Sequence, residues 1–103
     1  MSVLERKIAT SFRPNYIRLL PPGEVIAEKI GEMDIDEAEF ARRCGLPLET
    51  IQQLLQADIP LTQEIADKVE KVTLMNADGM MRLETRYRKD LEFTQQHPEY
   101  PVV

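Results

Sequence analysis

One short stretch of the chain carries side chains that could read the edges of DNA bases. Glu49, Gln52, Gln53 and Gln56 are spaced i, i+3, i+4 and i+7, so on a helix they would form one polar stripe. Glutamine can form two hydrogen bonds with adenine, and glutamate can accept one from cytosine. The alternative is that the stripe is only the solvated face of a helix, and the residue types alone allow both interpretations.

Any grip on the DNA backbone would have to come from cations outside this stretch, because residues 47–56 contain no lysine or arginine. Arg42 and Arg43 are the nearest, although they would also suit the carboxyl end of a helix, where cations offset the helix dipole. The net charge of the chain is −5, and residues 21–73 hold twelve acidic and five basic side chains. Acidic surfaces repel phosphates, so backbone contacts would also depend on the basic N-terminal segment. Its cations are Arg6, Lys7, Arg13 and Arg18.

The elements that would position these side chains are helices. Apolar residues recur at helical rather than strand spacing, which predicts an all-α protein with five main helices. Asp36, Thr62 and Asn76 are the expected N-caps, and Glu39 would complete a capping box with Asp36. The expected helices cover residues 21–33, 37–44, 47–56, 63–72 and 77–91. We expect a basic N-terminal arm over residues 1–20, a helical domain over 21–95 and a flexible tail over 96–103.

The second and third expected helices have the steric pattern of a helix-turn-helix. Two short helices that cross steeply need a small residue at the crossing, a left-handed turn, and a branched apolar residue that faces back into the crossing. Ala41, Gly45 and Ile51 have these types at the required spacing. An ordinary αα-hairpin uses the same residue types and is the alternative. The remaining core positions of the motif would be filled by Phe40, Leu46 and Leu54.

Further segments extend this pattern over residues 21–91: PPGEVIAEKI, FARRCGL, IPLTQEIADKVEKVT and RLETRYRKDLE. Together they resemble the HigA-type antitoxins of plasmid-maintenance modules, which belong to the broad Xre and lambda-repressor-like family. PPGEV and the LT before the fourth helix are fairly specific to that group. The resemblance implies a five-helix lambda-repressor-like DNA-binding domain, often dimeric, that represses its own operon and neutralises a partner ribonuclease toxin.

Several positions at which such proteins contact DNA differ in this chain. The residue that opens the first motif helix, usually a glutamine bonded to a phosphate, is Glu37 here. The recognition helix opens with Pro47, Leu48 and Glu49 instead of small polar residues, and Thr50 stands where arginine is common. The following loop is QADI instead of a basic NGKR-like sequence. The DNA-binding positions predicted in this chain are Glu37, Arg42, Arg43, Leu48, Glu49, Thr50, Gln52, Gln53 and Gln56.

Two functions fit these observations. The first is a DNA-binding transcriptional regulator of the HigA antitoxin type, which acts as a homodimer on operator DNA and neutralises a basic toxin protein. The second is a protein-interaction module that keeps the fold, has lost sequence-specific DNA binding, and turns its acidic middle towards a basic partner such as a toxin. The polar stripe without lysine or arginine favours the second function, and the basic N-terminal arm favours the first.

No pattern in the sequence indicates catalysis, a cofactor or a metal. The chain has no P-loop, nucleophile elbow or zinc-protease motif, and His97 has no ligand partners at metal spacing. We therefore expect a protein that is not an enzyme. The single Cys44 cannot form an internal disulfide, and no apolar run is long enough for a membrane helix or a secretion signal. These features indicate a cytoplasmic protein.

Overall fold

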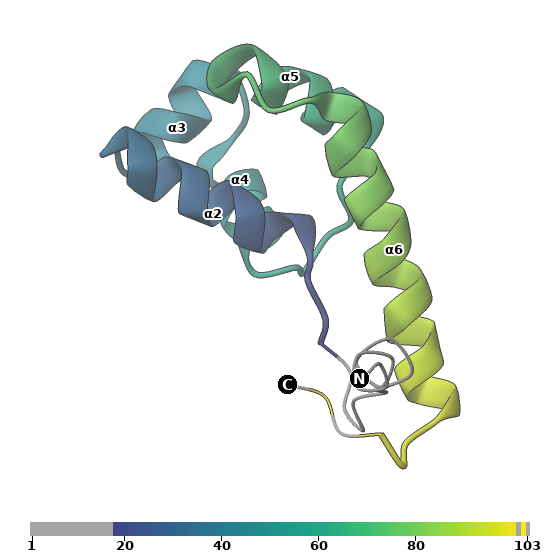
Figure 1. Cartoon of the computed structure of the whole chain (residues 1–103). Helices are drawn as coiled ribbons and strands as arrows, with labels where there is room; N and C mark the ends of the chain where they lie inside the picture. Colours follow the sequence, from purple (N-terminus) through teal and green to yellow (C-terminus); the bar gives the residue numbers. More distant parts are fainter. Residues whose placement is uncertain (1–17, 101, 103) are drawn as a thin grey trace, which may run out of the picture.

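The structure, a computed structural model, describes residues 18–100 and residue 102, and Figure 1 shows their arrangement. These residues form five α-helices and contain no β-strand, so the predicted all-α fold with a helix-turn-helix is confirmed. The helices are α2 (Pro22–Met33), α3 (Glu37–Cys44), α4 (Leu48–Leu55), α5 (Gln63–Thr73) and α6 (Ala77–Gln96).

The helices begin where local sequence signals place them. The side chains of Asp36, Thr62 and Asn76 each accept a hydrogen bond from the backbone N–H three residues further on, at 2.8, 3.3 and 2.7 Å. Such caps satisfy N–H groups that have no partner within the helix. Helices α2 and α4 begin after Pro21 and Pro47, whose fixed φ suits the entry into a helix.

A left-handed glycine closes the turn between α3 and α4. Gly45 has φ 71° and ψ 34°, as the helix-turn-helix pattern requires. Its N–H donates to the carbonyl of Arg42 at 3.2 Å, and the N–H of Leu46 donates to the carbonyl of Ala41 at 3.0 Å. This pair of hydrogen bonds is the Schellman motif, which ends α3 and turns the chain into α4.

The core lies between the helix-turn-helix and the helices around it. Helix α4 packs against both α2 and α3, and α5 packs against α3 and α6. Of the predicted motif-core residues, Phe40, Ala41, Ile51 and Leu54 are buried, while Gly45 lies exposed in the turn. Because these side chains are buried in one shared core, their packing fixes how α3 and α4 cross.

The first turn of α2 meets the end of α4 at a point with no room for a side chain. A Cβ atom on Gly23 would lie 2.9 Å from the Cα of Leu55, and nearer still to the carbonyl oxygen of Leu54. Glycine at this position therefore allows two helix backbones to touch. This contact gives a physical reason for the PPG sequence at the start of α2.

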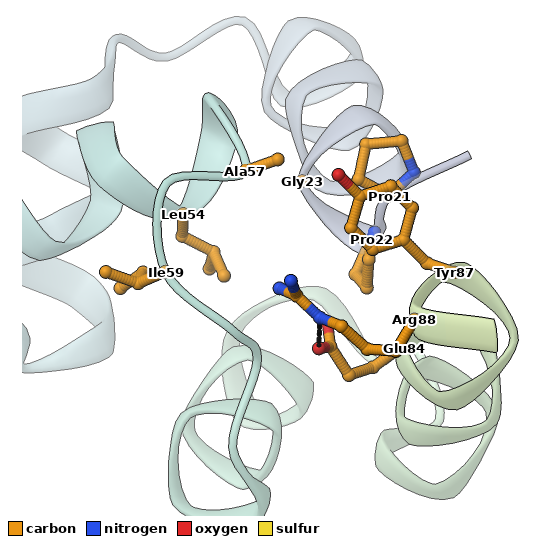
Figure 2. Close-up of a pocket in the computed structure, with 9 residues that line it drawn as sticks. All are labelled: Pro21, Pro22, Gly23, Leu54, Ala57, Ile59, Glu84, Tyr87 and Arg88. Carbon is orange, nitrogen blue, oxygen red and sulfur yellow. Dashed lines mark hydrogen bonds and ion pairs between the residues drawn. The ribbon is translucent and has the colours of Figure 1, made fainter. Parts of the chain in front are cut away.

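A buried carboxylate ties α6 to the loop between α4 and α5. Glu84 is only 7% exposed and accepts a hydrogen bond from the N–H of Leu61 at 3.2 Å and from Nε of Arg88 at 2.6 Å. Figure 2 shows this pair facing Pro21, Pro22 and Gly23 across a narrow gap. The carboxylate thus links elements that are distant in the sequence.

Helix α6 extends well beyond the other helices (Figure 1). Its buried residues end at Tyr87, more than two turns before its end at Gln96. Beyond them, the ring of Phe93 stacks on His97 with centroids 4.1 Å apart, and Tyr100 lies 5.7 Å from Phe93. Gln96, which the sequence analysis assigned to the tail, is the last residue of α6.

Two further expectations concern the basic N-terminal arm and the absence of a membrane helix. Arg6, Lys7 and Arg13 of the predicted basic arm lie outside the described residues, whereas Arg18 pairs with Glu24 at 3.7 Å. None of the five helices is long and apolar enough to cross a membrane.

Candidate nucleic-acid interface

Helix α4 presents most of the predicted stripe to solvent. Glu49, Gln52 and Gln56 are exposed, and Leu48 is 40% exposed at the start of the helix. Gln53 is half-buried, as is Thr50, so these two side chains are less free to reach a ligand. Ile51 and Leu54 turn inward on the opposite side, which leaves the polar side outward.

Three of the predicted site residues line one hollow. Glu37 from the first turn of α3 and Leu48 and Gln52 from α4 line an open, shallow depression of about 550 Å³, together with part of α2. Ile30 and Ile35 contribute apolar surface to it. The structure therefore brings the starts of both motif helices together at one surface, where this motif places its ligand contacts.

The two arginines of α3 are held by a glutamate of the same helix. Nε of Arg42 lies 3.0 Å from one carboxylate oxygen of Glu39, and Nε of Arg43 lies 2.8 Å from the other. Hydrogen bonds from Arg42 and then Arg43 lower the pKa of the Glu39 carboxyl to about 2. The three side chains together carry a single positive charge at neutral pH, and their exposure leaves them free to rearrange.

The helix-turn-helix surface as a whole is acidic. Residues 34–58 contain six acidic and two basic side chains, and both basic ones pair with Glu39. Within the part of the chain that the structure describes, Asp36, Glu37 and Glu49 form no ion pair. A DNA backbone approaching this surface would meet repulsion before it met an available cation.

Two glutamates have roles in the structure that were not expected from the sequence. Glu39 was expected to complete a capping box, but its carboxylate holds Arg42 and Arg43 instead. Its spacing of three and four residues from these arginines is the signal that indicates such pairing. Glu84 gave no comparable signal, because its backbone partner Leu61 is 23 residues away.

Comparison with known proteins places the fold. No family model matches the chain, and no curated protein sequence matches it. Among solved structures, the chain is similar to a candidate antidote protein of a plasmid maintenance system from Nostoc punctiforme. The TM-score is 0.74 at 27% sequence identity, and the match covers 82% of this chain and 92% of that one. The two proteins therefore share the all-α fold that contains the helix-turn-helix.

Proposed function

We propose that this protein is an antitoxin of the HigA type within the Xre and lambda-repressor-like family. The observation that carries the proposal is the structural match to the plasmid-maintenance antidote protein over 82% of the chain. The PPG contact at Gly23 and the Schellman turn at Gly45 support it, because both are local features that fix the geometry of the motif. In this role the protein acts in the cytoplasm and neutralises a basic ribonuclease toxin.

The toxin half of the proposal is tested by expression with the protein encoded by the neighbouring gene. Expression of that neighbour alone should arrest growth, and expression of this chain with it should restore growth and yield a complex of the two. A mutant of this chain that does not fold, such as one with proline in the middle of α4, serves as the control. A harmless neighbour, or arrest that this chain does not relieve, would contradict the antitoxin role.

We also propose that the protein represses its own operon as a homodimer on operator DNA. A dimer would present two α4 helices to half-sites about one helical turn apart, roughly 34–36 Å. Gln52 and Glu49 are the exposed residues that would contact bases, and Arg42 and Arg43 would contact phosphates after leaving Glu39. The basic segment of residues 1–20 would add affinity without sequence preference.

A titration against the protein's own promoter DNA at several salt concentrations tests this second half. We expect saturable binding that random DNA competes poorly and that weakens as salt rises, because the two arginines of α3 and the basic segment would contact phosphates. Gln52→Ala should relax the sequence preference and leave non-specific affinity nearly unchanged. Binding to promoter and random DNA with equal affinity would refute operator recognition.

One observation favours a second function, in which the protein is an interaction module without operator binding. The only arginines of the motif are both paired with Glu39, and α4 itself has no cation. The two functions are separated by the same titration. A folded protein that relieves toxicity but binds no DNA at low salt would be the interaction module.

A further inference from the structure

We infer that the hollow between α2, α3 and α4 is the docking site for the toxin, and that it receives a basic segment with an aliphatic side chain flanked by arginine or lysine. The inference rests on the proposed antitoxin function and adds to it the site and chemistry of the contact. It is carried by the shape, the apolar surface and the charge of the hollow.

The hollow is wide and shallow, so a partner side chain could lie across it. Its volume is about 550 Å³, and it is open to solvent. Gly31 of α2 forms part of the lining, and a Cβ atom added there would meet no atom within 4 Å. Because Gly31 itself carries no side chain, a partner could approach the helix backbone closely at this point.

The hollow also offers apolar surface that an aliphatic side chain would cover. Leu48, which is 40% exposed at the start of α4, lines the hollow together with the half-buried Ile35 and the nearly buried Ile30. Burying such surface on binding is favourable. A phosphate backbone would not make use of this apolar surface.

The charge around the hollow selects a basic occupant. Asp36 and Glu37 lie on its rim and form no ion pair within residues 18–100. The nearest cation of α2, Lys29, pairs with Glu32 at 3.5 Å, and those of α3 are held by Glu39. Charge complementarity therefore favours arginine or lysine beside the aliphatic anchor and disfavours DNA.

The hollow overlaps the predicted DNA-binding surface. Glu37, Leu48 and Gln52 line the hollow and are also predicted DNA-binding positions. A toxin docked there would cover the surface that α4 would turn to the operator. Toxin and operator DNA should therefore exclude each other on the same protomer.

The experiment measures the affinity of the full chain for the purified protein encoded by the neighbouring gene, using calorimetry. Leu48→Gln and Glu37→Gln should each weaken binding about tenfold or more, which is the loss expected of an interface anchor. Gly31→Gln, which fills the hollow without removing any core atom, should weaken it similarly. The matched controls are Leu74→Gln and Glu92→Gln, which remove an exposed leucine and an exposed glutamate elsewhere and should change affinity less than about twofold. Thermal melts confirm that each variant is folded.

The possible results separate the inference from the function on which it rests. If the toxin binds wild type and all hollow variants equally, the inference is wrong and the antitoxin role stands. If wild type does not bind, the proposed function fails and the inference fails with it. If the hollow variants keep toxin affinity but lose promoter binding, the occupant is DNA; if they change only the oligomeric state, it is a second copy of the chain. Both of the last two results overturn the inference.

Discussion

Replacing Gly23 with alanine tests the contact that sets α4 against α2. The added Cβ would lie 2.9 Å from the Cα of Leu55 and closer still to the Leu54 carbonyl oxygen. Both neighbours are backbone atoms of the helix that carries the predicted recognition stripe, so no rotation of a side chain can relieve the clash. One of the two helices has to move.

The expected cost exceeds the gain that alanine brings to a helix. Overpacking a close contact costs about 1–3 kcal/mol, whereas replacing glycine in a helix gains at most about 1 kcal/mol. We therefore expect the Gly23 variant to lose about 1–2 kcal/mol of unfolding free energy. Since 1 kcal/mol shifts the Tm of a domain of this size by about 4–8 °C, the loss is readily measured by thermal or urea unfolding.

Gly31→Ala is the matched control in the same helix. Nothing lies within 4 Å of the Cβ it would add, so only the gain in helix propensity remains. Its Tm should rise by a few degrees, while that of Gly23→Ala should fall. The same glycine-to-alanine substitution in one helix should therefore shift the Tm in opposite directions at the two positions. If both variants melt at or above the wild-type temperature, the close approach of α2 and α4 is wrong.

Three further substitutions test other parts of the structure. Ala41→Leu should cost about 1–3 kcal/mol through overpacking of the motif core, and a wild-type melt would contradict the crossing of α3 and α4. Glu84→Ala should cost about 1–3 kcal/mol because the Leu61 N–H loses its buried partner, whereas exposed Glu92→Ala should not. Glu39→Gln should strengthen non-specific DNA binding and steepen its salt dependence, because Arg42 and Arg43 are released. Because the pKa of Glu39 is lowered from 4.5 to about 2 in the folded protein, its ion pairs stabilise the fold at pH above 4.5, and this contribution is lost as the pH falls towards 2. The Glu39→Gln variant lacks that contribution and should therefore lose less stability than wild type over the same pH range.

The features that the sequence predicted well are those set by neighbouring residues. The caps at Asp36 and Asn76 and the left-handed Gly45 depend on hydrogen bonds spanning five residues or fewer, and the structure confirms each of them. The buried Glu84 was missed because its role depends on a loop 23 residues away. From the sequence of α6 alone, a charged residue such as Glu84 would be expected to lie exposed to solvent.

The candidate residues on α4 were predicted from the sequence, but the surface that they share with α2 was not. The stripe of α4 was expected from its spacing, yet the hollow also needs α2, whose Gly31 and Ile30 give no functional signal in the sequence. Gln53 belongs to the same stripe as Gln52 but is half-buried, because its exposure depends on the tertiary packing around α4 and not on the helical period alone. Spacing on one helix therefore identifies candidate residues, and tertiary packing decides which of them a partner can reach.

The inner and outer sides of α4 contribute differently to the stability of the fold. Ile51 and Leu54 on the inner side of α4 are buried, so changes there cost folding free energy directly. Glu49 and Gln52 on the outer side are exposed, and substitutions at such positions usually change stability by less than about 0.5 kcal/mol. The outer side can therefore exchange cations for carboxylates while the helix-turn-helix remains intact. The choice between DNA and a basic protein as the partner of this surface therefore depends on its charges, which the Glu37→Gln and Glu39→Gln variants change directly.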